Sequence, residues 1–353
     1  MRILFVKLGS IGDIVHTLPA LAAVRRALPE AEITWVVEER SAEILRGNPM
    51  VDRLVEVDTR EFRGGRRIDD LLASFGKQVK GLRGHKYDIA IDLQGLWKSA
   101  GIAKLSGAKK RFGFSRQALR EPASRVLLTD TVEVPEKIHV IRKNLALVAG
   151  ALGINVPNTD LEFPISTSEE HVVEAEAIVS TSGGGEFAIL NPGGGWVTKL
   201  WHAEKFGQLA DRLWTERGIT PIVVTGPKEH ELARDVAAAS KCGRLVLAVP
   251  GLKAFYELAR QAHLYIGGDT GPTHIAVAAG VPIVGLFGPT EWWRNGSPRP
   301  DDVCVDRTDI SCRVDCHRRT CGVWICMDFG MDKVFEAVEQ RLANHASLGE
   351  LVA

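Results

Sequence analysis

Three loops of the sequence carry groups that could bind phosphate or sugar hydroxyls, and each follows an apolar, β-branched run. The most distinctive is DTGPTH, residues 269–274. Pro272 suits the first turn of a helix, and Thr270 or Asp269 can cap that helix. The exposed N–H groups of such a turn attract anions, so the loop predicts an anion site. His274 falls in the same turn, where it could reach a phosphate or pack as an ordinary core histidine.

The second loop is rich in glycine and ends in a lysine. Residues 191–201 read NPGGGWVTKLW, in which Gly194 and Gly195 can expose backbone donors. Lys199 supplies a point charge that matches a diphosphate, or it faces solvent as an ordinary loop lysine. In the third loop, TGPKE, Glu229 could accept hydrogen bonds from ribose hydroxyls or begin a helix as a favourable acid.

A carboxylate near the N-terminus is the candidate general base. The segment KLGSIGD follows the first apolar run and places Gly9 and Gly12 just before Asp13. Glycines allow a tight turn and the close approach of a ligand at the mouth of a sheet. Asp13 could therefore act at that mouth, or it could only complement the N-terminus of a helix.

A nicotinamide site is a rival interpretation of the same turn. Glu38 and Glu39 stand at the end of the next apolar run, where a ribose-binding acid could lie. The turn has only Gly9 and Gly12, without the G-x-G pair that lets a pyrophosphate lie against it. The incomplete fingerprint disfavours a nicotinamide-dependent oxidoreductase. A non-catalytic module that binds a nucleotide-sugar or nucleic acid is the rival outside the enzymes.

These loops need strands and helices that alternate along the chain, and the hydrophobic pattern predicts such an alternation. Repeated strand–helix pairs predict parallel sheets covered by helices, hence an α/β fold. The expected strands are 2–7, 33–38, 53–57, 88–93, 187–192, 219–226, 244–249, 264–269 and 282–288. The expected helices are 13–28, 203–217, 228–240, 253–262 and 271–279.

The length of the chain predicts two domains. With 353 residues, the chain exceeds what one hydrophobic core usually organises. Residues 153–170 are rich in Pro, Asn, Ser and Thr, which suits a linker. We expect two Rossmann-like, doubly wound domains, residues 1–160 and 161–353, that face one another across a ligand-binding cleft. The last helix could return to the N-terminal domain.

The net charge of zero hides a difference between the two halves. Residues 1–150 hold 26 Lys and Arg against 18 Asp and Glu, about +8, and the remainder holds 18 against 26, about −8. The excess is concentrated in residues 60–125, with 16 basic and six acidic residues. A positive field of this size favours a polyanion such as a phosphorylated lipid, a nucleic acid or a membrane surface, although a basic run can also be a solvated face.

The absence of long apolar runs and the cysteine content bear on location and redox state. No apolar run suits a secretory signal or a membrane span, so a cytosolic protein is expected. There, six cysteines would be reduced thiols or metal ligands. Four of them form the series Cys312-x3-Cys316-x4-Cys321-x4-Cys326, with His317 nearby. Because the series lacks a C-x2-C knuckle, reduced or locally bridged thiols are favoured over a bound metal.

Long blocks of the sequence resemble glycosyltransferase family 9, the ADP-heptose:lipopolysaccharide heptosyltransferases, and most closely the heptosyltransferase I branch. The blocks are GSIGDIVHTLPAL (9–21), WVVEE (35–39), DLQGLWKSA (92–100), REPAS (120–124), KLWHAEKF (199–206) and GGDTGPTHIAVAAGVPIVGLFGPT (267–290). The resemblance implies a GT-B fold, ADP-L-glycero-D-manno-heptose as donor and a Kdo sugar of the lipid A inner core as acceptor. The alternative is a heptosyltransferase of type II or III with another acceptor. The cysteine series resembles that of other branches of the family, so this alternative stays open.

The same resemblance implies roles for single residues. The catalytic aspartate falls on Asp13, and the diphosphate lysine falls on Lys199. The other donor-binding residues implied are Gly194, Gly195, Glu229, Asp269, Thr270, Gly271 and His274. The acceptor-binding residues implied are Gly12, Arg60, Arg63, Lys98 and Arg120. Hydroxyl residues that heptosyltransferase I carries before the lysine are replaced here by Gly194 and Gly195, so backbone donors must take their place.

The implied reaction is an inverting single displacement without a metal or cofactor, since no DxD-like carboxylate pair stands where it could hold a metal on the diphosphate. Asp13 would take the proton of the acceptor hydroxyl, while Lys199 and the helix near Thr270 stabilise the departing diphosphate. Phosphorylated lipid A gives the basic region 60–125 a polyanionic partner. Peripheral association with the cytoplasmic face of the inner membrane, weakened by salt, is therefore expected, and nucleic acid is not an expected partner.

Overall fold

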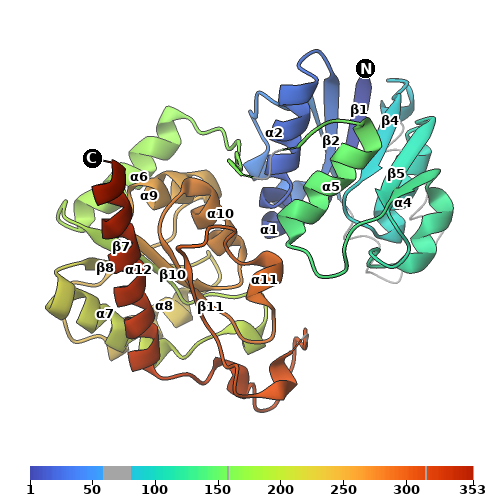
Figure 1. Cartoon of the computed structure of the whole chain (residues 1–353). Helices are drawn as coiled ribbons and strands as arrows, with labels where there is room; N and C mark the ends of the chain where they lie inside the picture. The colour runs from blue at the N-terminus through green and yellow to red at the C-terminus, as the bar shows by residue number, and fades with distance from the viewer. Residues whose placement is uncertain (59–80, 157–158, 315, 353) are drawn as a thin grey trace. The chain divides into compact units, whose positions relative to one another are not determined.

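The computed structural model describes residues 1–58, 81–156, 159–314 and 316–352. The chain folds into two compact units, Met1–Ser166 and Thr167–Ala353 (Figure 1). Each unit contains a six-stranded sheet in which all the paired strands are parallel, with helices packed against it. The α/β class predicted from the alternating pattern is confirmed.

The first unit is a doubly wound sheet whose strand order is β3-β2-β1-β4-β5-β6. Its strands are β1 (Arg2–Val6), β2 (Glu32–Glu38), β3 (Arg53–Val57), β4 (Ile89–Asp92), β5 (Lys110–Phe114) and β6 (Asp130–Val132). Its helices are α1 (Ile11–Val15), α2 (Leu18–Ala27), η1 (Glu39–Ile44), α4 (Trp97–Leu105), η3 (Pro122–Leu127) and α5 (Val140–Leu152). The order reverses between β1 and β4, and a sheet of this kind binds ligands at the carboxyl ends of the strands that flank such a reversal.

The helix expected over residues 13–28 is a wrong prediction. The structure has two helices there, because α1 ends at Val15 and α2 begins at Leu18 with Thr17 as its N-cap. Pro19 lies in the first turn of α2, where its missing N–H costs nothing, whereas inside a longer helix it would leave the carbonyl four residues earlier without a donor. The break lets α1 stay short and keeps Asp13 within its first turn.

The second unit repeats the same topology with the order β12-β11-β10-β7-β8-β9. Its strands are β7 (Phe187–Asn191), β8 (Thr220–Val224), β9 (Val246–Ala248), β10 (Leu264–Gly268), β11 (Ile283–Leu286) and β12 (Val303–Val305). Its helices are α6 (Glu169–Thr181), η4 (Val197–Lys199), α7 (Ala203–Arg217), α8 (His230–Ala239), α9 (Leu252–Gln261), α10 (Gly271–Ala279), α11 (Trp292–Asn295), η5 (Ser311–Arg313), η6 (Ile325–Met327) and α12 (Met331–Val352).

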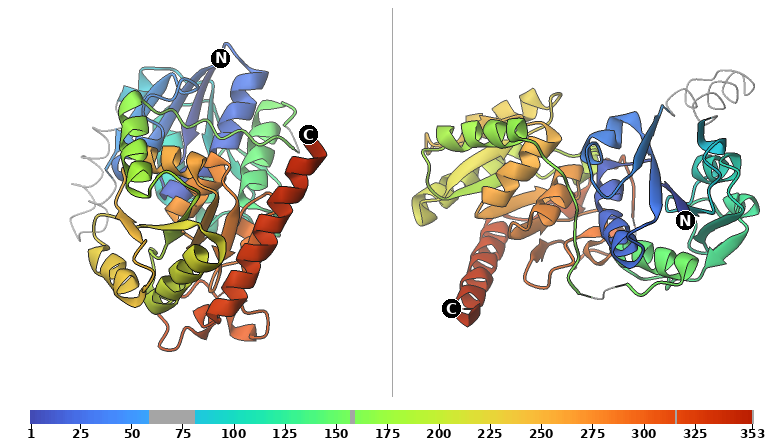
Figure 2. Two further views of the ribbon diagram at one scale, coloured as in Figure 1. Left: turned by 90° about the vertical axis from the view of Figure 1, so that its left-hand side faces the viewer. Right: turned by 90° about the horizontal axis from the view of Figure 1, so that it is seen from above.

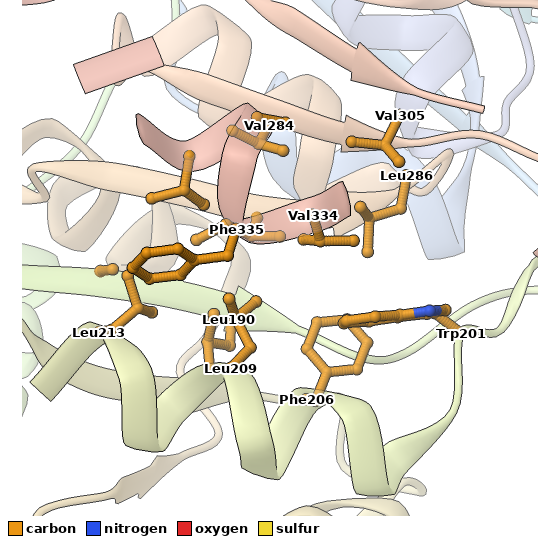
Figure 3. Packing of buried hydrophobic residues seen from close by; sticks show 14 of the residues in the cluster. Leu190, Trp201, Phe206, Leu209, Leu213, Val284, Leu286, Val305, Val334 and Phe335 are labelled. Atoms are coloured by element: carbon orange, nitrogen blue, oxygen red, sulfur yellow. The ribbon is translucent and has the colours of Figure 1, made fainter. Parts of the chain in front are cut away.

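The core of the second unit joins α7 and α12 to the sheet. Figure 3 shows Leu209 and Leu213 of α7 on one side of this core and Val334 and Phe335 of α12 within it. Trp201 is buried between two other rings, with centroid distances of 4.9 Å to Phe206 and 5.8 Å to Phe329. The last helix thus packs on the second unit, where it runs beside α7, β11 and β12. Figure 2 gives two further views of this helix, coloured red.

Across the described part of the chain, no helix combines the length and the apolar character needed to span a bilayer.

Candidate functional site

The carboxylate of Asp269 is the centre of a polar cluster at the carboxyl end of β10. Lys199 donates to its Oδ2 at 2.6 Å, and Asn295 donates to its Oδ1 at 2.8 Å. Nε2 of His274 lies 3.2 Å from the same Oδ1. Burial alone would raise the pKa of Asp269, but the hydrogen bond from His274 and the charge of Lys199 outweigh burial and hold that pKa well below its usual range. The carboxylate is therefore permanently charged at neutral pH.

Thr270 is the N-cap of α10, and its side chain accepts a hydrogen bond from the backbone N–H of Thr273. The Thr270 hydroxyl also donates to Oδ1 of Asn191 at 3.2 Å. Behind it, the hydroxyls of Thr273 and Tyr265 are 2.9 Å apart, and burial raises the pKa of Tyr265, so its hydroxyl stays protonated. This network fixes the first turn of α10, which begins at Gly271. Pro272 has no N–H and the N–H of Thr273 is bonded to Thr270, so the N–H of Gly271 is the donor that this turn can offer an anion.

The glycine loop before Lys199 follows β7 directly. A Cβ on Gly194 would lie 2.9 Å from Cδ2 of Leu200, so a side chain there would collide with the loop, whereas Gly195 meets no atom within 4 Å. The Nζ of Lys199 also lies 4.3 Å from the centroid of the Trp196 ring. The loop thus presents backbone at Gly194 and Gly195 and a lysine at its end.

Glu229 lies beside the same loop. Its carboxylate accepts a hydrogen bond of 2.7 Å from the backbone N–H of Gly226, and Glu229 is the N-cap of α8. A Cβ on Gly193 would approach Oε2 of Glu229 to 2.5 Å, so the glycine makes room for this carboxylate. Of the two roles weighed from the sequence, the start of a helix matches this position, and the carboxylate also lies beside Gly193 of the glycine loop.

In the first unit, Asp13 is the third residue of α1, and its Oδ2 accepts from the backbone N–H of Ser10 at 3.0 Å. Its Oδ1 lies 3.2 Å from Nη2 of Arg120 and 3.7 Å from Nζ of Lys7. The side chain keeps 15% of its surface exposed. Asp13 therefore caps the helix and, at the same time, stands at the strand end beside two cations. Arg120, expected on the acceptor side, is one of those cations.

Two buried charged residues beneath Asp13 were missed from the sequence. Lys7 donates to the carbonyl of Leu93 at 2.8 Å, and burial lowers its pKa, although the charge of Asp13 opposes this. Asp92 is fully buried at the end of β4, and burial raises its pKa to about 6 against hydrogen bonds from the backbone N–H groups of Gly95 and Gln94. In the sequence, the burial of these two residues was indicated only by the apolar residues next to each of them.

The other residues predicted to bind the acceptor lie in three different settings. Gly12 is buried in the first turn of α1. Lys98, on α4, donates to Oε1 of the buried Glu38 at 2.6 Å, so its charge is paired within the protein. Arg60 and Arg63 lie outside the described residues.

The cysteine-rich segment, residues 311–314 and 316–327, contacts the glycine loop and the η4 turn that follows it. Thr198 donates to the carbonyl of Arg318 at 2.8 Å, and the guanidinium carbon of Arg319 lies 5.2 Å from the centroid of the Trp196 ring. Among the residues described, the six cysteines form no disulfide, and no three His, Cys, Asp or Glu side chains are arranged to hold a metal ion. Asn191, Trp196 and Asn295 are site residues that the sequence analysis missed.

The two clusters supply different chemistry. That of the second unit combines a lysine, a helix N-terminus and exposed loop N–H groups, which suits a diphosphate. That of the first unit holds a carboxylate at a strand end with some exposure, which suits proton abstraction.

Comparison with known proteins identifies the family. The model of glycosyltransferase family 9 (heptosyltransferase) matches residues 75–321. Lipopolysaccharide heptosyltransferase 1 of Pseudomonas aeruginosa is 31% identical over 322 residues, 91% of this chain and 87% of that protein. The enzyme of the same name from Escherichia coli K12 is 28% identical over 82% of this chain and 89% of its own. The solved structure of E. coli heptosyltransferase WaaC with ADP matches with a TM-score of 0.74 and 25% identity, over 98% of this chain and 99% of that one. The chain has the GT-B fold and belongs to glycosyltransferase family 9.

Proposed function

We propose that this glycosyltransferase transfers L-glycero-D-manno-heptose from ADP-heptose to a Kdo sugar of the lipopolysaccharide inner core. The names of the two relatives support the sugar and the core acceptor, and the solved relative with ADP supports the nucleotide. The observation that carries the proposal is the cluster of Lys199 and Asp269 at the N-terminus of α10, beside a glycine loop.

The donor diphosphate would bind across the glycine loop and the first turn of α10. The N–H groups of Gly194, Gly195 and Gly271 would donate to phosphate oxygens, and the Nζ of Lys199 would share its hydrogen bonds between Asp269 and the diphosphate. Negative charge grows on the diphosphate as the bond to the anomeric carbon breaks. The same donors stabilise that charge, so they lower the barrier as well as bind the donor.

Asp13 would act as the general base. The acceptor hydroxyl oxygen attacks the anomeric carbon from the face opposite ADP, Asp13 takes the hydroxyl proton, and ADP leaves with the electron pair of the broken bond. Arg120, at 3.2 Å, orients the carboxylate. The helix N-terminus and the cations also stabilise the carboxylate and make it a weaker base. Proton transfer is therefore late and concerted with formation of the new bond.

The basic first half would bring the enzyme to its lipid acceptor. We propose peripheral association with the cytoplasmic face of the inner membrane through the excess of Lys and Arg in residues 60–125. Binding to vesicles that contain acceptor lipid should weaken as ionic strength rises, because salt screens exposed charges. Binding that does not change between low and high salt would contradict this electrostatic account.

The function is tested by incubating the protein with ADP-heptose and Kdo-lipid A. Release of ADP together with a lipid heavier by one heptose is expected. A matched reaction with a Kdo-lipid acceptor that already carries the first heptose distinguishes the heptosyltransferase II or III alternative. Thermal stabilisation by NADH rather than ADP, with no sugar transfer, would contradict the proposal.

A further inference from the structure

The charge of the diphosphate lysine is already balanced within the protein. Lys199 donates to Oδ2 of Asp269 at 2.6 Å and to its backbone carbonyl at 3.0 Å. Both side chains are mostly buried, with 12% and 6% of their surfaces exposed. A diphosphate that enters beside this pair brings two or more negative charges against a net charge near zero. Anions removed from water need compensating cations, so the pair leaves room for a second one.

The cysteine-rich segment brings a cation to this place. The ring of Trp196 lies 4.3 Å from Nζ of Lys199 and 5.2 Å from the guanidinium carbon of Arg319. Tryptophan is the strongest partner for such cation–π contacts, and a stacked guanidinium keeps its N–H groups free at its edge. Within the described residues, no carboxylate forms an ion pair with Arg319. One aromatic ring thus holds two cations at the end of the glycine loop.

The backbone of the segment is tied to two other parts of the second unit, the η4 turn and the loop after β11. The carbonyl of Arg318 accepts from the hydroxyl of Thr198 at 2.8 Å. The N–H of His317 donates to the carbonyl of Pro289 at 3.0 Å, and the His317 ring lies 3.1 Å from Nη1 of Arg294 on α11. These contacts fix residues 317–319 against the loop, so the position of Arg319 does not depend on its side chain alone.

We propose that Arg319 is a second diphosphate-binding residue of the donor site and that the contacts of residues 317 and 318 hold it beside Lys199. This inference rests on the proposed function, because it assumes a nucleoside diphosphate-sugar as donor. It also accounts for a loop with glycines at positions 194 and 195: the cation that helps to bind the diphosphate comes from a different part of the chain. A guanidinium suits the task, because its planar fork can bind two phosphate oxygens at once.

The test is the affinity for ADP and for adenosine, measured by titration calorimetry on the full chain. Arg319→Ala should weaken ADP binding about 10- to 30-fold, as expected when a hydrogen-bonded charge pair is lost. Adenosine binding should stay within twofold of the wild-type value, because adenosine has no phosphate. Arg319→Lys should recover part of the ADP affinity. Arg318→Ala is the matched control, since Arg318 contacts Thr198 through its backbone carbonyl, which the substitution keeps, and it should leave both affinities unchanged.

The outcomes distinguish an error in the proposed donor from an error in the proposed role of Arg319. If the wild-type protein does not bind ADP, the proposed donor is wrong. If it binds ADP and Arg319→Ala binds ADP equally well, the donor stands and the role of Arg319 is wrong. Equal losses of ADP and adenosine affinity would also overturn the proposal, because they would indicate a merely structural role.

Discussion

Asp13 and Asp269 occupy comparable places in the two units, but their contacts and their burial differ. Both lie at a helix N-terminus after a central strand, and both have a lysine as neighbour. Asp269 has partners at 2.6, 2.8 and 3.2 Å, whereas Asp13 accepts from the N–H of Ser10 at 3.0 Å and has cations at 3.2 and 3.7 Å. Asp269 is also the more buried of the two, with 6% of its side chain exposed against 15%.

The difference indicates a division of labour between two related folds. A carboxylate that is saturated with short contacts orients other groups and keeps its charge, which suits the donor side. A carboxylate with longer contacts and an exposed edge can still accept a proton, which suits the base. Each of the following predictions either breaks this comparison or sharpens it.

The largest effect is expected for Asp13→Asn. The amide keeps the hydrogen bond from Ser10 but cannot take a proton, so turnover should fall about 10³-fold, within the range of general-base catalysis. Affinity for ADP should not change. Steady-state kinetics with ADP-heptose and calorimetry with ADP measure the two quantities. Retention of more than a tenth of the wild-type turnover would show that Asp13 is not the general base.

Lys199→Met should destabilise the second unit by about 4 kcal/mol, because it leaves the Asp269 carboxylate buried with less compensation. The double variant Lys199→Met/Asp269→Asn should recover most of that loss. Chemical unfolding read by hydrogen exchange in β10 measures both. If the single and double variants were equally unstable, the pairing would not be the cause.

The same pair predicts an acid-side effect in the second unit. The pKa of Asp269 is held below its unfolded value, so the stability it contributes is present above about pH 4 and is lost as the pH falls further. Lys199→Met should show a smaller loss between about pH 4 and about pH 2, the range just below the pKa of an aspartate in the unfolded chain. Unfolding at a series of pH values measures it.

Asp92→Asn should act in the opposite direction, in the first unit. The pKa of Asp92 is raised to about 6, so its contribution to stability is full below about pH 4 and is lost as the pH rises through 6. Relative to wild type, the variant should gain up to about 3 kcal/mol between pH 4 and pH 7. Hydrogen exchange of the β1 amides measures this gain. A difference independent of pH would show that Asp92 does not titrate in that range.

The smallest effect is expected for Glu38→Gln, which releases the charge of Lys98. The KM for the anionic acceptor should fall about threefold, with kcat unchanged, because Lys98, whose side chain is 29% exposed, loses its charged partner and can turn to the acceptor. Added salt should remove the difference. An unchanged KM at low salt would mean that Lys98 does not contact the acceptor.

Much of the fold could be predicted, because its signals are local. The helix over 271–279 matches α10 at both ends, since Thr270 caps it, Pro272 fits its first turn and Gly280 adopts the left-handed conformation that ends it. The helix over 203–217 matches α7 for a similar reason, with Gly218 at its end. The break at Pro19 was also local, but the apolar pattern that continues across it hid the boundary.

The contacts within the candidate site could not be predicted from pattern alone. Lys98 and Glu38 are 60 residues apart, and Asp13 and Arg120 are 107 apart, so only the order of strands in the sheet brings each pair together. The position of Lys7 beneath Asp13 depends on the neighbouring strand β4. The family resemblance named Asp13 and Arg120 without indicating that they touch.

The bonding of one thiol offers a way to observe the donor loop directly. The sulfur of Cys321 accepts hydrogen bonds from the backbone N–H groups of Val323 and Trp324, which lower its pKa, whereas burial raises the pKa of Cys304 and of Cys326. Maleimides react with thiolates, so a dye should attach to Cys321 ahead of those two. A fluorophore there would sit two residues from Arg319 and would respond to nucleotide arrival in real time.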